Sequence, residues 1–283
     1  MGAAIQALRS ASRSIVDVPA AAVVVGLFAT LLWLVSYATA LLPLVGFFVT
    51  AIATAFLVGG MYAVANRAAS HRVTDIGAAT VLIRARWISL LIAYGVLWVV
   101  GFVLGIVVLL PLVIVILFGT IAGNLLAIVA GLIVIGAYGS VLYFLFAMVF
   151  QFLYPGVAIR DLGAIDSLKR ATGLVRSAPL SVAGFTLVRL AIQYVPLLLG
   201  GLIALFIGRD VLAAVLAEFE AIVDDPPTDP AAQPDFFEIL FAVADTGTIV
   251  AMVLLLFLGG TIGEILRIFY LTAFFRSVTD EDE

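Results

Sequence analysis

The apolar residues of this chain are gathered into blocks that are long enough to cross a lipid bilayer as helices. Of its 283 residues, 65% are hydrophobic and only 11% are charged, whereas a typical soluble domain carries about 25% charged residues. A hydrocarbon core about 30 Å thick needs about 20 helical residues for each crossing. Six blocks are long enough, at residues 18–42, 44–65, 87–118, 125–153, 181–207 and 246–275. The sequence therefore predicts an all-α, polytopic membrane protein with six transmembrane helices.

Loop charges decide how the continuous apolar stretch 87–153 is divided, because it has room for three crossings as well as two. Lysine and arginine in short loops stay in the cytoplasm. Two crossings leave the cationic loops 66–86 and 154–180 on one side of the membrane, together with both termini. We therefore expect a multi-pass protein of the plasma membrane with cytoplasmic N- and C-termini. The extra length of 87–118 is expected to be taken up by tilt or by a kink at Pro111, with a partly re-entrant segment at 111–124 as the alternative.

A threefold internal repeat is the most specific pattern outside the apolar blocks. The run from Ile5 to Ala11 matches Ile165 to Ala171, and Asp75 to Ala78 matches Asp161 to Ala164. Each polar segment precedes two apolar blocks, and the third has the spacing of an amphipathic helix that lies in the headgroup plane. We thus expect one membrane domain, 1–283, built from three parallel repeats of an interfacial amphipathic helix plus a transmembrane hairpin. The repeats are expected at about 1–65, 75–153 and 161–275.

Small residues recur at four-residue spacing in three of the apolar blocks, a pattern that lets helices approach closely. The sets are Gly101 and Gly105, Gly259 and Gly263, and Gly200 with Ala204 and Gly208. They indicate either helix contacts within one chain or a dimer interface. The oligomeric state stays open.

The segment 208–245 differs from the rest because it is acidic, with Arg209 as its one cation. An apolar stripe from Val211 to Ile222 and a second apolar run from Phe236 to Val243 flank a proline-rich break. We expect an extracytoplasmic cap of two interfacial helices with a solvated acidic surface. Calcium binding is the alternative, although the spacing of a dedicated calcium loop is absent. The acidic balance excludes a basic nucleic-acid surface, and the scarcity of lysine is typical of halophilic archaea.

Ionisable residues inside the predicted helices are the candidate functional groups, because charge in a bilayer is costly. Arg189 lies in the fifth helix, with Gln193 one turn further on. Glu264 and Arg267 lie one turn apart in the sixth helix at similar predicted depth. One interpretation is structural, with Glu264 neutralising the two arginines. The alternatives are a ligand site for an anion or a lipid phosphate, which suits arginine's planar fork, and a proton or ion pathway through Glu264.

Catalytic and cofactor motifs are absent from the sequence. It contains no cysteine and one histidine, His71, which lies in a basic loop without a carboxylate at catalytic spacing. Nucleophile-elbow, phosphate-loop and zinc-protease motifs are missing. We expect no enzyme activity, no catalytic residues, no cofactor and no metal.

The run from Gly163 to Ala171, followed by Pro179 and a new apolar helix, resembles a recurring element of uncharacterised six-helix membrane families of haloarchaeal type. These are similar to the membrane domain attached to some bacterial glycerophosphodiester phosphodiesterases. The resemblance implies the helical layout and nothing catalytic, because no phosphodiesterase domain is present.

Two functional hypotheses follow from the sequence. The first is a non-enzymatic membrane module that organises membrane lipids or a protein partner through its cytoplasmic amphipathic helices; it predicts a closed bundle with Arg189 paired to Glu264. The alternative is a small transporter or channel for an anionic solute or ion, which predicts a hydrated cavity at the same residues. The first is preferred, because the helices carry few intramembrane polar groups.

Overall fold

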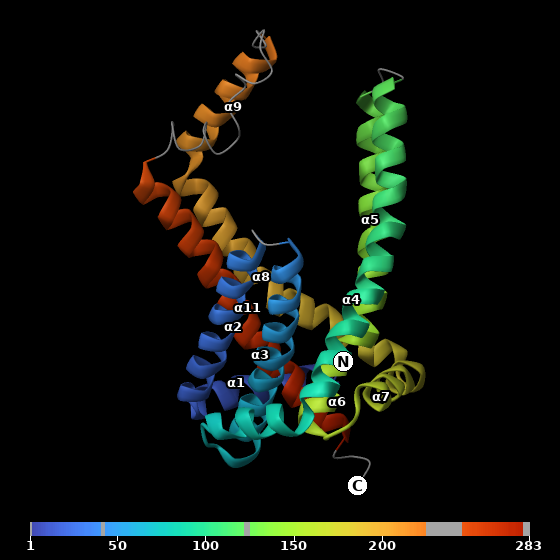
Figure 1. Cartoon of the computed structure of the whole chain (residues 1–283), viewed down its shortest axis with the longest axis vertical. Helices are drawn as coiled ribbons and strands as arrows, with labels where there is room; N and C mark the ends of the chain where they lie inside the picture. The colour runs from blue at the N-terminus through green and yellow to red at the C-terminus, as the bar shows by residue number, and fades with distance from the viewer. Residues whose placement is uncertain (1, 41–42, 122–124, 225–244, 280–283) are drawn as a thin grey trace. The chain divides into compact units, whose positions relative to one another are not determined.

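The computed structural model describes residues 2–40, 43–121, 125–224 and 245–279, and all regular structure in these ranges is α-helical (Figure 1). The helices are α1 (Gly2–Asp17), α2 (Pro19–Ala40), α3 (Pro43–His71), α4 (Ile76–Ile121), α5 (Leu125–Phe150), α6 (Leu153–Ile159), α7 (Ala164–Ser177), α8 (Pro179–Ile207), α9 (Arg209–Asp224) and α11 (Thr246–Thr279).

Six of the described helical segments are long and apolar enough to cross a membrane. They are Pro19–Thr39, Val45–His71, Ile76–Gly119, Leu126–Ile159, Pro179–Ile207 and Thr246–Val278. Each overlaps one of the six predicted blocks, so the all-α polytopic fold is confirmed. Many of their large apolar side chains are exposed, as expected for helices whose outer surface faces lipid.

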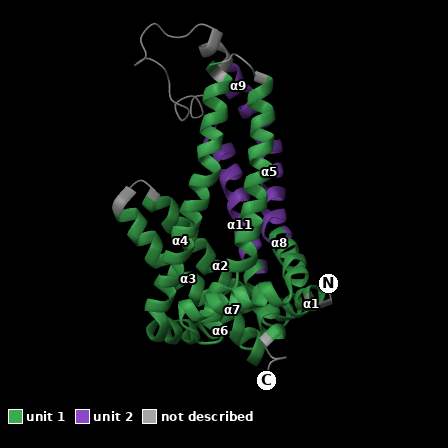
Figure 2. Cartoon of the chain, turned by 90° about the vertical axis from the view of Figure 1, so that its right-hand side faces the viewer, with its two compact units in different colours: residues 1–190, 267–283 green, residues 191–266 purple. Residues whose placement is uncertain are grey.

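The chain divides into two compact units (Figure 2). Unit 1 comprises residues 1–190 and 267–283, and unit 2 comprises residues 191–266. Helices α8 and α11 each contribute to both units.

In unit 1, α3 contacts α1, α2, α4 and α6, and α4 contacts α3, α5, α6 and α7, so these two helices connect the others. A stack of aromatic rings forms part of the core between α6, α8 and α11. The Phe185 ring centroid lies 3.7 Å from that of Phe274 and 4.6 Å from that of Tyr270. All three side chains are at most 1% exposed, so this stack fixes the first part of α8 against the last part of α11.

Helix α4 is interrupted at Arg86, where φ is −129° and ψ is 18°. The break in helical geometry thus lies at Arg86, and α4 continues as a helix through Pro111, so the expected kink at Pro111 stays a prediction. Proline is tolerated within membrane helices, where neighbouring groups satisfy the carbonyl that it frees. Residues 111–121 belong to α4 and not to a re-entrant loop, and 122–124 lie outside the described residues.

Short helices precede the long ones at three points in the chain: α1, the first part of α4 up to Arg86, and α7. Helices α1 and α7 bury the same face. The buried positions of α1 are Ala4, Ala7 and Ala11, and those of α7 are Ala164, Ser167 and Ala171. These positions coincide in the sequence alignment that suggested the repeat, although the repeat as a whole stays a prediction.

Unit 2 is held together by close contact between α8 and α11 at glycines. A Cβ atom at Gly200 would lie 2.6 Å from the Leu255 carbonyl oxygen, and one at Gly259 would lie 2.5 Å from that of Pro196. The intrachain interpretation of these small residues is therefore confirmed. In contrast, a Cβ atom at Gly101 or Gly105 would meet no described atom within 4 Å.

The first helix of the expected acidic cap is present as α9. The second expected helix, from Phe236 to Val243, lies outside the described residues.

Candidate functional site

Arg189 is the most deeply buried charged residue among those that the structure describes, with 5% of its surface exposed. It lies ten residues after the start of α8 at Pro179, about 15 Å along the helix axis at 1.5 Å per residue. Val182, Phe185 and Thr186 are buried on the same face at helical spacing, whereas Leu180 and Leu187 are exposed. The rotation of α8 therefore turns Arg189 into the protein and away from the lipid-facing side.

The surroundings of Arg189 in unit 1 are polar but contain a second cation. Arg189 donates a hydrogen bond to the Tyr143 hydroxyl of α5, and its guanidinium interacts with Tyr62 of α3 and with Arg267 of α11. Arg267 also interacts with the Tyr154 hydroxyl of α6. We call these five residues the arginine cluster; they come from five different helices of unit 1.

Several polar atoms of the arginine cluster have no partner among the described residues. Nε and Nη2 of Arg189 are buried and make no hydrogen bond, and the Tyr154 hydroxyl is likewise buried without a hydrogen-bond partner. Leaving a buried donor unsatisfied costs about 1–3 kcal/mol, and more for a charged group. Two unpaired N–H groups of one guanidinium match the two oxygens of a carboxylate or phosphate. The cluster therefore has the donors of an anion site.

One turn before Arg189, the donors of a neighbouring polar pair are hydrogen-bonded, whereas Gln151 Oε1 is buried without a partner among the described residues. Gln151 Nε2 donates a 2.7 Å hydrogen bond to Thr186 Oγ1, which in turn donates to the Val182 carbonyl oxygen. This hydrogen bond joins the turn between α5 and α6 to α8. Arg189 is the next residue on this face of α8, and it has donors that make no hydrogen bond.

The other two predicted site residues form a pair in unit 2. Gln193 Nε2 donates a hydrogen bond of 3.2 Å to Glu264 Oε1. Gln193 Oε1 and Thr261 Oγ1 of the same unit are buried and without a hydrogen-bond partner among the described residues. Of the four residues predicted from sequence, Gln193 and Glu264 thus form a hydrogen-bonded pair in unit 2, and Arg189 and Arg267 of unit 1 act on each other electrostatically. The predicted pairing of Arg189 with Glu264 stays a prediction.

Sequence reasoning missed the three tyrosines of the arginine cluster. A tyrosine inside an apolar span was a usable signal, because a buried phenol normally finds a hydrogen-bond partner. Tyr62 is 1% exposed and Tyr154 is 7% exposed, so both side chains face the interior of the protein.

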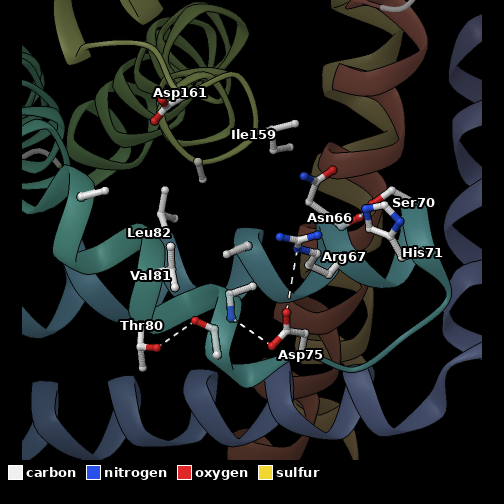
Figure 3. A pocket seen from close by; sticks show the side chains of 15 residues that line it. Asn66, Arg67, Ser70, His71, Asp75, Thr80, Val81, Leu82, Ile159 and Asp161 are labelled. Atoms are coloured by element: carbon white, nitrogen blue, oxygen red, sulfur yellow. Dashed lines mark hydrogen bonds and ion pairs between the residues drawn. The ribbon is translucent and has the colours of Figure 1, made fainter.

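A separate pocket of about 670 Å³ lies where the end of α3, the start of α4 and residues 158–161 meet (Figure 3). Its charges are compensated. Arg67 Nε lies 3.9 Å from Asp75 Oδ2, and Asp161 accepts a hydrogen bond from Arg86 Nε. That guanidinium holds the pKa of the Asp161 carboxyl below its usual value. His71 is exposed at the pocket wall, as expected for a solvated histidine.

Comparison with known proteins gives a family and no activity. The family model described as "Domain of unknown function (DUF7847)" matches residues 3–278. No curated protein and no solved structure matches the chain.

Proposed function

The chain belongs to the DUF7847 family, a domain of unknown function, and from its own geometry we propose that it is a non-enzymatic membrane module that binds anionic lipid. One observation carries the proposal: Arg189 is buried in an apolar span with two N–H groups that meet no acceptor among the described residues. Such a group is very unfavourable in a bilayer unless a ligand completes it.

The chemistry of the arginine cluster favours an oxyanion. Arg189 would bind two oxygens through its planar fork, and Arg267 adds positive potential beside it. The unpartnered Tyr154 hydroxyl supplies a neutral donor close to Arg267. A lipid phosphate is the preferred source of these oxygens, because lipid surrounds the membrane spans, and it would have to reach Arg189 between the helices, since this side chain is buried.

The proposal includes a membrane placement. Both termini are cytoplasmic in the plasma membrane of a salt-adapted cell, and α1, the start of α4 and α7 are the interfacial helices of three parallel repeats. The matching buried faces of α1 and α7 support the repeat. A protein partner would bind to the exposed faces of these interfacial helices. This role fits the resemblance to membrane domains that are attached to phosphodiesterases.

Lipid retention tests the proposal. The full chain is purified, reconstituted in nanodiscs of phosphatidylcholine and phosphatidylglycerol, and extracted under conditions that remove bulk lipid. Native mass spectrometry then measures the bound phosphatidylglycerol. The variants are Arg189→Gln, Arg189→Lys and, as the matched control, Arg209→Gln, whose arginine side chain is 68% exposed.

Arg189→Gln is expected to lower lipid occupancy by about tenfold or more, as the loss of a charge-assisted pair implies. Arg189→Lys keeps the charge but loses the fork, so its occupancy should be intermediate, and Arg209→Gln should retain lipid. Equal retention by Arg189→Gln and Arg209→Gln would reject the lipid site.

Transport of an anionic solute is the second candidate, and the unpartnered Thr261 hydroxyl of unit 2, which can donate to an anion, favours it. Anion flux into liposomes that depends on both Arg189 and Gln193 would support transport. Lipid retention without flux would support the module.

The proposed topology can be tested by labelling single introduced cysteines, because the chain has no cysteine of its own. Ser12→Cys in α1 should be protected from a membrane-impermeant maleimide in intact cells, whereas Asp210→Cys in α9 should be labelled. The reverse pattern would overturn the proposed orientation.

A further inference from the structure

A second pocket, of about 460 Å³, lies between the polar face of α1 and the end of α3. Its walls carry three arginines, Arg9, Arg13 and Arg72, and one carboxylate, Asp17. None of these four groups makes an ion pair within the part of the chain that the structure describes. The pocket therefore has a formal excess of positive charge that the described residues do not neutralise.

Neighbouring cations on the same end of unit 1 behave differently. Arg67 faces Asp75, Arg86 binds Asp161, and Lys169 lies 3.3 Å from Asp166. Three other cations of unit 1 therefore have carboxylate partners, whereas the three arginines of the second pocket make no ion pair among the described residues.

The backbone at Arg72 is a second, independent observation. Arg72 follows the last residue of α3 with φ at 55°, in the left-handed region. Glycine or asparagine occupies this region at lower cost than arginine. The Arg72 N–H ends α3 by donating a 3.1 Å hydrogen bond to the Ala68 carbonyl oxygen, and this turn places Arg72 at the wall of the pocket.

Helix α1 has three faces, which together fit a helix at the membrane surface. Ala4, Ala7 and Ala11 are buried against the rest of unit 1. Ile5, Leu8 and Val16 are exposed, at 50%, 42% and 76% of their surface. The remaining face, with Arg9 and Arg13, lines the pocket. An apolar face beside a cationic pocket is the arrangement that receives an acyl chain and its headgroup together.

We propose that this pocket binds the phosphate group of an anionic membrane lipid, with Arg9, Arg13 and Arg72 as its ligands and the lipid's acyl chains along the exposed apolar face of α1. The inference rests on the membrane placement in the proposed function but not on the arginine cluster, since no residue is shared between the two sites. Inorganic phosphate offers the same oxygens, so the test must separate the two sources.

The test uses the full chain in phosphatidylcholine nanodiscs that contain spin-labelled phosphatidylglycerol. Electron paramagnetic resonance measures the immobilised lipid fraction, and hence the preference of the protein for the anionic lipid. The variants are the double change Arg9→Gln with Arg13→Gln, and Arg72→Asn, which removes the charge while keeping a side chain that tolerates left-handed backbone. Arg84→Gln is the matched control, because Arg84 is exposed and lines neither pocket.

Each pocket arginine that is removed should lower the preference for phosphatidylglycerol by about tenfold or more, because a charge-assisted hydrogen bond to the phosphate is lost. Arg84→Gln should lower it by at most about fivefold, the general contribution of one cation near an anionic membrane surface. The preference should weaken in concentrated salt, because these arginines are exposed to screening. A double variant that behaves like Arg84→Gln would overturn the proposal.

Displacement of the labelled lipid by inorganic phosphate at equal concentration would instead assign the pocket to a free anion and overturn the lipid assignment. Arg189→Gln separates this proposal from the proposed function. If Arg189→Gln alone removes the immobilised lipid, the second pocket is rejected as a lipid site and the arginine cluster is supported. If only the pocket variants remove it, the second pocket is supported and the arginine cluster is rejected.

Discussion

Arg189 of α8 and Arg267 of α11 interact within unit 1, and the Tyr143 hydroxyl accepts a hydrogen bond from Arg189. Two guanidinium groups repel each other most strongly where water is scarce. Helices that bring them together therefore need compensating contacts, which the tyrosine hydroxyls and a bound anion provide in the proposed site.

Tyr143→Phe is expected to lower the free energy of unfolding by about 1–2 kcal/mol, because it leaves another donor of Arg189 without an acceptor. Tyr138→Phe on the same helix is the control, since Tyr138 is about as exposed as Tyr143, at 45% against 43%, and makes no hydrogen bond among the described residues. Chemical denaturation in detergent micelles, followed by tryptophan fluorescence, measures the difference. Equal effects of the two changes would show that the Tyr143 hydroxyl does not support Arg189.

Gly259→Ala is expected to destabilise the protein by about 1–3 kcal/mol, as overpacking does. Its Cβ atom would meet the Pro196 carbonyl oxygen at 2.5 Å and the Leu197 Cα atom at 3.1 Å, and neither backbone atom moves without separating α8 from α11. Gly101→Ala should be neutral or stabilising by up to about 1 kcal/mol, because it adds helix propensity in open space.

Thermal unfolding of both glycine variants gives the comparison, and size-exclusion chromatography with light scattering gives their oligomeric state. A change of oligomeric state in Gly101→Ala would contradict this prediction and would indicate a dimer interface at Gly101 and Gly105.

The transmembrane spans could be predicted from sequence because they depend on local composition. The thickness of the bilayer sets how many consecutive apolar residues a helix needs to cross it. Arg189 and Glu264 could be found because a charge inside an apolar run is conspicuous. The members of the arginine cluster on α3, α5 and α6 could not, since their meeting depends on the rotation of each helix about its axis.

Asp75 and Asp161 show a further limit of pattern reasoning. The proposed repeat aligns them, yet they act differently. Asp75 Oδ1 accepts a hydrogen bond from the Ala78 N–H at the start of α4, whereas Asp161 binds Arg86 and has a left-handed φ of 57°. An alignment gives equivalent positions, but tertiary contacts decide which partner each carboxylate meets.

Asp75→Ala should cost about 1 kcal/mol of stability, because it removes an N-cap. Asp75→Asn should cost less, since asparagine caps equally well and only the exposed ion pair with Arg67 is lost. Hydrogen exchange at the amides of residues 78–80 locates the effect. If exchange there rises equally in both variants, the charge of Asp75 matters and the cap does not.

The ion pair of Asp161 with Arg86 predicts a loss of stability in acid. The guanidinium lowers the pKa of Asp161 below its ordinary value of 3.8, so the folded state favours the ionised carboxyl. The stabilisation is complete above the unfolded pKa and disappears as the pH falls through the lower, folded pKa. Because the Asp161 side chain is 70% exposed, the effect should not exceed about 1 kcal/mol. Asp161→Asn tolerates the left-handed backbone, removes the charge and should flatten this part of the profile. Unfolding measured between about pH 6 and pH 3 checks the prediction, and parallel profiles for the two proteins would show that the pair contributes nothing.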